Sequence, residues 1–359
     1  MEITKIKSMF FNMKKIRRQK MKNTTKIFGY EGGTFSDKDI VQARKNNIPL
    51  TMDCALPGGC LNKCFYCGYF GVNHGPKLTQ DEIVRVFEEF AALGGKSIKI
   101  LGEGEPLLRK DILPLLAKIR NLGVIPVLFT CGDVLGSDEL AQKIHHLSCD
   151  GIVRKLHDIG ATVMLKYERQ QQDSIVQRKG YSTLRNKALT RLLSAGFNRY
   201  HPTRLGFGIV LLKQNYGKIA YIFNFALHNN IYPLVCPLMP IGKVADPEIR
   251  VKYSPCPREI TNLIQRLVTL REHEGIYFPD PVAFPGGLPC DIARAGMYMD
   301  DIGNIKLCEA DDTVGNIRDS SLAELWQRCS KIKDRKYGKE RWVGRCFPKI
   351  SAGILECPC

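Results

Sequence analysis

The chain contains 359 residues, of which 44% are hydrophobic and 25% charged, so it is neither disordered nor fibrous and can hold one large α/β domain with a smaller one. The basic segment 1–20 lacks the apolar core of a signal peptide and no later stretch approaches a membrane span, so we expect a cytoplasmic protein with no membrane partner. Fourteen cysteines in such a compartment favour metal binding over disulfides.

The formal net charge of +17 is concentrated in two segments of the chain. Residues 1–27 hold nine Lys or Arg against one acidic residue, and residues 328–349 hold nine against two, which leaves about +2 for everything else. This distribution predicts a flexible basic arm at the N-terminus and a solvated basic surface near the C-terminus. The charge either keeps the protein soluble or attracts an acidic partner, such as RNA or an acidic leader peptide.

Residues 48–236 alternate strand-like apolar runs with amphipathic helical stretches, which predicts a parallel α/β fold. Thr79 and Glu82 form a capping box, the typical start of a helix. We expect strands at 48–56, 97–101, 124–130, 162–167, 205–212 and 231–236, helices at 79–93, 112–122, 181–195 and 216–228, one or two more helices between 130 and 162, and a bridging helix at 258–273. These six strand–helix steps fit an open barrel or a doubly wound sheet.

Three cysteines follow the first expected strand at CxxxCxxC spacing: Cys60, Cys64 and Cys67. Thiolates on one short loop suit an iron–sulfur cluster, and three of them leave one iron of a cubane without a protein ligand. A structural zinc site and a disulfide are the weaker alternatives, because zinc usually takes a second cysteine pair and disulfides need an oxidising compartment.

This motif, with Tyr66 directly before its last cysteine, resembles the cluster motif of the radical S-adenosylmethionine (radical SAM) superfamily. The resemblance implies a partial (β/α)6 barrel and a [4Fe-4S] cluster whose open iron binds the amino and carboxylate groups of SAM. It also implies reductive cleavage of SAM to methionine and a 5'-deoxyadenosyl radical that abstracts a substrate hydrogen. We therefore expect an electron donor, such as flavodoxin or ferredoxin, as a partner.

The strand at 97–101 ends in a turn that resembles the superfamily's GGEP segment, which binds the amino group of SAM. Gly104, Glu105 and Pro106 match that segment, whereas Glu103 replaces its first glycine. We include these four residues and Tyr66 among the candidate cofactor-binding residues.

Other candidate residues follow later strands. Lys166 or Arg169 is placed to meet the SAM carboxylate or ribose, and Asn215 the ribose hydroxyls. Cys131 stands where relatives often carry asparagine, so no function is carried over to it. Cys236 ends the sixth strand, where a thiol could donate a hydrogen atom to a substrate radical.

A second cysteine set lies near the C-terminus, in a segment that resembles the SPASM or shortened twitch extension of radical SAM enzymes. Cys290 and a Gly-x4-Cys segment that ends at Cys308 match its first part, and a turn at Gly303 would bring these two cysteines together. The resemblance implies one auxiliary [4Fe-4S] cluster, held by Cys290, Cys308 and two of Cys346, Cys357 and Cys359. The alternative is a set of buried thiols without metal.

We therefore expect a basic arm and lead-in at 1–47, a radical SAM partial barrel at 48–240, a bridging region at 241–280 and an auxiliary-cluster domain at 281–359. The leading hypothesis for the substrate is a ribosomally made peptide, presented by a separate leader-binding protein. The rival is a sugar or aminocyclitol that is dehydrogenated, epimerised or deaminated. RNA modification ranks third, and an iron–sulfur electron carrier without enzymatic activity ranks last. The auxiliary cluster is expected to accept an electron from the substrate radical or to anchor the substrate.

Overall fold

The computed structural model describes residues 28–68, 74–168, 172–276, 284, 290, 292, 295–337 and 352–354. Its centre is a nine-stranded sheet in the order β6-β5-β4-β3-β2-β1-β7-β8-β9. The strands are β1 (Thr51–Cys54), β2 (Ser97–Ile100), β3 (Ile125–Thr130), β4 (Thr162–Lys166), β5 (Leu205–Leu211), β6 (Tyr232–Pro237), β7 (Gly296–Met299), β8 (Asn304–Lys306) and β9 (Thr313–Asn316). All six strands expected from the sequence are confirmed.

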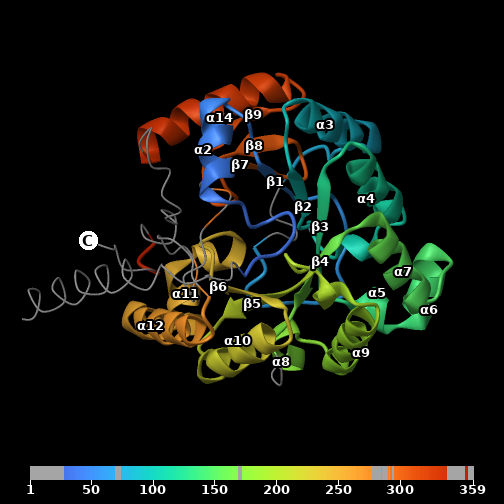
Figure 1. The fold of residues 1–359 in the computed structure, drawn as a ribbon, viewed down its shortest axis with the longest axis vertical. Coiled ribbons are helices and arrows are strands. Elements are labelled where there is room, and N and C mark those ends of the chain that lie inside the picture. Colours follow the sequence, from blue (N-terminus) through green and yellow to red (C-terminus); the bar gives the residue numbers. More distant parts are fainter. Residues whose placement is uncertain are drawn as a thin grey trace, which may run out of the picture.

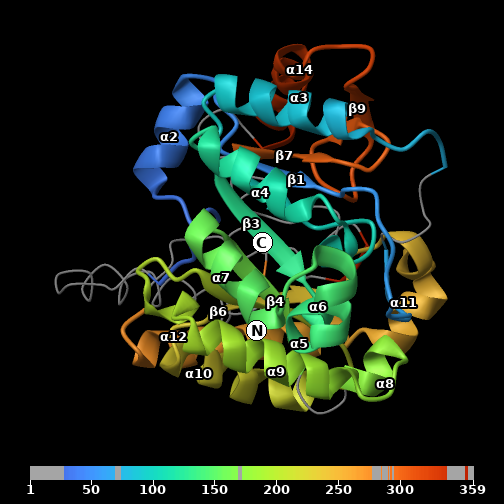
Figure 2. The ribbon, with the colours of Figure 1, turned by 90° about the vertical axis from the view of Figure 1, so that its right-hand side faces the viewer.

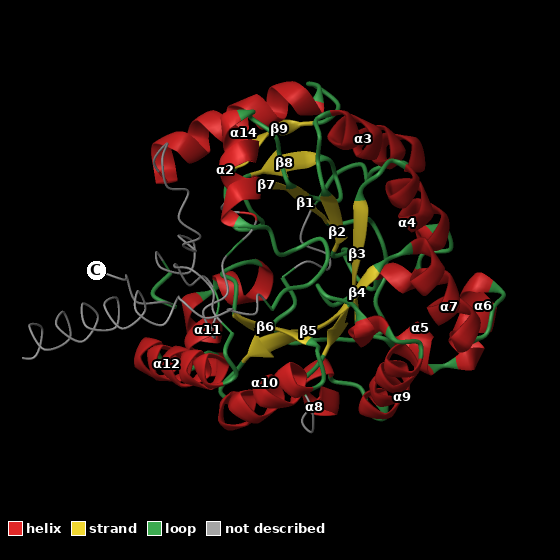
Figure 3. Ribbon diagram, in the orientation of Figure 1, coloured by secondary structure: helices red, strands yellow, loops and turns green. Residues whose placement is uncertain are grey.

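Strands β1 to β6 pair in parallel, each with the next strand in the chain. Each connection therefore runs from the carboxyl end of one strand back to the amino end of the next. Figure 1 and Figure 3 show the strands in an arc, with helices along its outer side. The α/β class is confirmed, and the curved parallel sheet is consistent with a partial barrel rather than a flat doubly wound sheet. The carboxyl ends of the parallel strands therefore meet at one end of the arc, where such folds hold their chemistry.

The helices are α2 (Asp37–Lys45), α3 (Gln80–Ala92), α4 (Ile112–Asn121), α5 (Asp133–Gly136), α6 (Asp138–His145), α7 (Cys149–Ile159), α8 (Gln172–Val176), α9 (Tyr181–Ser194), α10 (Ile219–His228), α11 (Pro247–Tyr253), α12 (Pro257–His273) and α14 (Leu322–Tyr337). The five helices expected at 79–93, 112–122, 181–195, 216–228 and 258–273 are present, whereas residues 130–162 hold three helices rather than one or two, and α2, α8 and α11 were not predicted. The predicted capping box of α3 is present, with both reciprocal bonds between Thr79 and Glu82. The helix expected from residue 216 begins at Ile219, because Tyr216–Lys218 forms a 3-10 turn.

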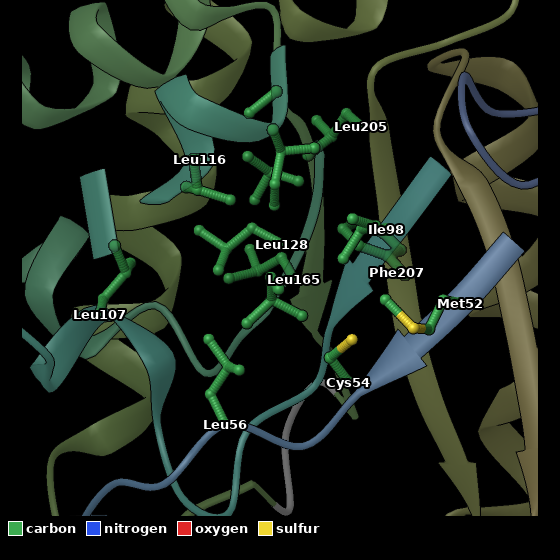
Figure 4. Packing of buried hydrophobic residues seen from close by; sticks show 14 of the residues in the cluster. Met52, Cys54, Leu56, Ile98, Leu107, Leu116, Leu128, Leu165, Leu205 and Phe207 are labelled. Carbon is green, nitrogen blue, oxygen red and sulfur yellow. The ribbon is translucent and has the colours of Figure 1, made fainter. Parts of the chain in front are cut away.

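The core lies between the parallel strands and their outer helices. Figure 4 shows Met52, Cys54, Ile98, Leu128 and other apolar side chains packed together, and these four side chains have no solvent exposure. Burying one leucine or isoleucine in this way contributes about 1.5–3 kcal/mol. Strands covered on both faces read as continuous apolar runs, which is why the sequence predicted them correctly.

The C-terminal segment continues the sheet of the barrel. Strand β7 pairs in parallel with β1, and β8 and β9 then add antiparallel strands. Helix α14 packs beside α3 (Figure 2), and the indole nitrogen of its buried Trp326 donates a 2.6 Å hydrogen bond to the carbonyl of Asn47, just after α2. The predicted boundary near residue 280 lies outside the described residues. None of the helices in the described ranges is long and apolar enough to cross a membrane.

Candidate cofactor site

The cysteine loop follows the carboxyl end of β1 and precedes α3 in the chain. Cys60, Cys64 and Cys67 are half-buried, and the amide of Cys67 donates to the carbonyl of Cys64 at 3.1 Å. Burial, together with repulsion from the negative charges of Glu105, Cys64 and Cys67, raises the pKa of Cys60 to about 12. The three sulfur atoms therefore share one partly buried space, where bound iron would supply the positive charge that thiolates need.

A single metal ion fits this space less well than a cluster. Across the described part of the chain, no three His, Cys, Asp or Glu side chains converge on one point as ligands of a single ion. A mononuclear zinc site needs that convergence, whereas a four-iron cubane is larger and takes each ligand on a different iron. Three soft thiolates on one loop, each able to bind a different iron, fit a [4Fe-4S] cluster with one open iron.

The turn at Gly104 is locked against the cysteine loop. Gly104 has φ +129°, and a Cβ atom there would lie 2.3 Å from the carbonyl oxygen of Gly59. The amide of the next residue, Glu105, donates to the same Gly59 carbonyl at 2.8 Å. Only glycine permits both the backbone conformation and this close approach. The segment that resembles GGEP therefore lies against the residue that precedes Cys60.

Glu105 is buried and links this turn to the end of β3. Its carboxylate accepts hydrogen bonds from the Thr130 hydroxyl at 2.6 Å and from the amides of Cys131 at 2.6 Å and Leu107 at 3.0 Å. Burial raises the pKa of Glu105, while these donors oppose the rise. A carboxylate can accept about four hydrogen bonds, so capacity remains for one further donor. Its predicted role with the SAM amino group stays a prediction.

Lys166 and Tyr66 lie together in a buried charged network beside Cys64. The Lys166 ammonium contacts the Glu168 carboxylate and the Tyr66 hydroxyl, and lies 4.8 Å from the centre of the Tyr66 ring. The Gln172 side-chain amide donates a hydrogen bond to the Glu168 carboxylate, and its oxygen accepts a 2.9 Å hydrogen bond from the Glu168 backbone amide. Burial raises the pKa of Cys64, and the Lys166 charge opposes that rise.

A second network contacts the loop through Asn62. The buried Asp133 carboxylate accepts hydrogen bonds from Arg178 at 2.8 Å and from the Cys131 thiol at 3.1 Å. Asn62, inside the cysteine loop, accepts from Arg178 at 3.1 Å. Sequence reasoning missed Glu168, Asp133 and Arg178, although the acidic residue two positions after Lys166 was a usable signal.

Three other candidates occupy different surroundings. Glu103 is buried and accepts a 2.8 Å bond from Lys77, which also pairs with Asp301 of the β7–β8 turn. Asn215 uses its side-chain amide on the backbone of β5 and the turn after it, with bonds of 2.9 and 2.7 Å to Leu212 and Val210. Cys236 is half-buried near the end of β6. Their proposed roles stay predictions, and Arg169 lies outside the described residues.

The hairpin of β7 and β8 separates the two C-terminal cysteines that the structure describes. Gly303, in the turn, has φ +88°, as the predicted tight turn requires. Cys290 and Cys308 are half-buried, and the Cys308 thiol donates to Asp311 at 3.3 Å. Cys346, Cys357 and Cys359 lie outside the described residues, so the auxiliary ligand set stays a prediction.

Comparisons with known proteins agree with this arrangement. A GTP 3',8-cyclase of Clostridium perfringens (strain 13 / Type A) is 30% identical over 198 residues, 53% of this chain and 55% of that protein. A probable GTP 3',8-cyclase of Sulfurisphaera tokodaii is 27% identical over 186 residues, 51% of this chain and 54% of that protein. The chain thus spans about half the length of these curated relatives.

Solved structures share the fold over most of the chain. Streptococcus suis SuiB bound to S-adenosylmethionine superposes with a TM-score of 0.62 at 17% identity, covering 98% of this chain and 87% of that one. The protein anSMEcpe with bound AdoMet gives a TM-score of 0.53 at 14% identity, covering 82% and 84%. Residues 56–226 match the model of the Radical SAM superfamily. That region contains the cysteine loop, the Gly104 turn and strands β2 to β5, so residues 56–226 form a domain of the radical SAM superfamily, whose members use a [4Fe-4S] cluster and SAM.

Proposed function

We propose that the chain is an enzyme that cleaves SAM reductively and removes a hydrogen atom from a substrate. The observation that carries the proposal is the close contact of the Gly104 turn with the cysteine loop, which puts the Glu105 carboxylate beside the space shared by the three thiols. When bound, the cluster and SAM together supply the 5'-deoxyadenosyl radical.

The protein's own residues hold and orient these groups. Cys60, Cys64 and Cys67 would ligate three irons of the cluster. The remaining acceptor capacity of Glu105 suits an ammonium group, and the Lys166 ammonium suits a carboxylate. Because SAM carries both groups on one carbon, two opposite charges, one after β2 and one at the end of β4, would orient it. Cys236 is retained as a candidate hydrogen donor to a substrate radical.

For the substrate, we favour a peptide. Streptococcus suis SuiB bound to precursor peptide SuiA superposes with a TM-score of 0.58 over 99% of this chain and 88% of that one. This similarity covers nearly the whole chain, whereas the two curated cyclases described above match 51% and 53% of it. A peptide modifier of this kind would take electrons from a flavodoxin or ferredoxin and its substrate from a separate leader-binding protein.

A second candidate substrate is GTP. The curated relatives that match the chain are named GTP 3',8-cyclases, and one of them is 30% identical over 198 residues. The sugar or aminocyclitol hypothesis stays a prediction and is tested alongside it.

The test is anaerobic reconstitution of the full chain with iron and sulfide, followed by SAM and dithionite. We expect about eight irons per chain, four for each cluster, and formation of 5'-deoxyadenosine. Reconstituted protein that binds iron but never cleaves SAM would contradict the proposed activity.

The substrate is then identified by the transfer of deuterium to 5'-deoxyadenosine. Candidate precursor peptides, GTP and aminocyclitols are added separately, and solvent deuterium or substrate deuterium in the 5'-deoxyadenosine is measured by mass spectrometry. Transfer of deuterium from a labelled peptide supports peptide modification. Transfer from labelled GTP alone would replace the peptide hypothesis by the cyclase one.

A further inference from the structure

Lys333 on α14 is a buried lysine in a segment whose basic composition predicts a solvated surface. Its side chain has no solvent exposure, whereas Lys331 on the same helix is exposed. Removing an ammonium group from water costs several kcal/mol unless nearby groups compensate it. Lys333 is therefore an exception to the solvated basic surface expected near the C-terminus. Neighbouring groups must offset the cost of removing its ammonium group from water.

The backbone supplies part of that environment. The Lys333 ammonium donates to the carbonyl of Ile292 at 2.7 Å and to the carbonyl of Leu307 at 3.4 Å. Ile292 lies two residues after Cys290, and Leu307 directly precedes Cys308. One side chain thus connects the two cysteine-bearing segments, which the β7–β8 hairpin separates in the chain.

Groups that can carry negative charge supply the rest. Burial lowers the pKa of Lys333, while Cys329, Cys308, Cys290 and Asp311 act in the opposite direction. Cys329 lies one helical turn before Lys333 and is fully buried, and burial raises its pKa to about 11. The groups whose charge acts on the ammonium include Cys290 and Cys308, the two predicted auxiliary ligands that the structure describes, and the Leu307 carbonyl that it contacts directly precedes Cys308.

We propose that Lys333 is a positioning residue of the auxiliary cluster, which holds the Cys290 and Cys308 segments together and raises the cluster's reduction potential. The inference rests on the proposed auxiliary cluster. A cluster with thiolate ligands is anionic, so adding an electron in a buried site is unfavourable, and a fixed cation nearby reduces that cost. A cluster of higher potential is better suited to accept an electron from a substrate radical.

The test compares Lys333→Met with Lys331→Met, which removes the same charge from an exposed position of the same helix. Both are made in the full chain carrying Cys60→Ala, so that the auxiliary cluster gives the spectroscopic signal. Electron paramagnetic resonance during a redox titration measures the potential. We expect Lys333→Met to lower the ratio of reduced to oxidised cluster at a given potential at least tenfold, a shift of about 59 mV for one electron. Lys331→Met should leave the potential unchanged.

Iron content and circular dichroism separate the outcomes. Loss of the remaining iron in folded Lys333→Met, but not in Lys331→Met, supports the positioning role. If Lys333→Met does not fold, Lys333→Gln, which keeps an N–H donor, is titrated and should show the same negative shift. A retained cluster with an unshifted potential would overturn the inference. Absence of iron from the Cys60→Ala parent itself would instead overturn the auxiliary cluster on which the inference rests.

Discussion

The two cysteine regions differ in the charges that surround them. Beside the Cys60–Cys67 loop, Lys166 is paired with Glu168 and Arg178 with Asp133, while the buried Glu105 carboxylate is held by the Thr130 hydroxyl and a backbone amide. Beside Cys290 and Cys308, the buried Lys333 ammonium is held by backbone carbonyls and faces the cysteines. A carboxylate in addition to the two ion pairs suits a cluster whose open iron takes a ligand with an ammonium group, whereas a fixed cation suits a cluster that accepts electrons. The difference predicts distinct roles for the two cysteine regions.

Removing one cysteine from each set tests most directly whether the two regions have different roles. Cys60→Ala should abolish formation of 5'-deoxyadenosine, because the cluster that binds SAM loses one of its three ligands. Cys308→Ala should leave some uncoupled SAM cleavage, because its cluster acts on the substrate. Both are measured by chromatography after anaerobic reduction. Cys256→Ser is the control, since Cys256 is exposed and serine suits its position before α12. Equal loss in the Cys60 and Cys308 variants would remove the distinction between the regions.

The Lys166–Glu168 pair sharpens the description of the first region. Lys166→Met leaves the buried Glu168 charge without its ammonium partner and should destabilise the fold by about 3 kcal/mol. Adding Glu168→Gln should recover most of that stability. If Lys166 also meets the SAM carboxylate, both variants bind SAM roughly tenfold more weakly, a loss of about 1.4 kcal/mol. Urea unfolding and SAM titration measure the two effects. Normal SAM affinity in the double variant would assign Lys166 a purely structural role.

Much of the first region could be predicted from the sequence, because its signals are local. The cysteine spacing, the turn at Gly104 and the apolar strands each lie within a few consecutive residues. Asp133 and Arg178 could not be found in this way, since they meet Asn62 only after distant segments pack together.

The second region was harder to predict. Lys333 stands among nine Lys or Arg in residues 328–349, and composition cannot distinguish the one that packing buries. Its burial follows from the way α14 lies over the β7–β8 hairpin, a tertiary contact with no local pattern.

The Gly104 turn offers a smaller change in the first region. Gly104→Ala introduces strain at φ +129° and a contact of 2.3 Å with the Gly59 carbonyl, so we expect a loss of about 2–3 kcal/mol in stability. The displaced turn should also weaken SAM binding. Gly59→Ala is the matched control in the same loop, because a Cβ there meets nothing within 4 Å. Thermal melting and SAM titration separate the variants. Similar stability and SAM affinity in both would contradict a role for the close contact between the Gly104 turn and the Gly59 carbonyl.

The Glu82–Arg318 pair joins the two regions and should have the smallest effect. Arg318 contacts Glu82 at 2.5 Å, and hydrogen bonds from Arg318 and Thr79 lower the Glu82 pKa from 4.5 to about 2. A depressed carboxyl pKa stabilises the fold above pH 4.5, and that contribution is lost as the pH falls toward 2. Glu82→Gln should cost about 1 kcal/mol at neutral pH and flatten the acid limb of the stability profile.

Glu88→Gln is the control for this pair, because Glu88 lies on the same helix but pairs with Lys118 of α4, at 2.6 Å, rather than with the C-terminal segment. Urea unfolding at several pH values should show the flattened profile for Glu82→Gln alone. If the two variants have the same acid limb, the contact between α3 and the C-terminal segment contributes no pH-dependent stability. The two cysteine regions would then be held together by apolar packing around Trp326 rather than by charge.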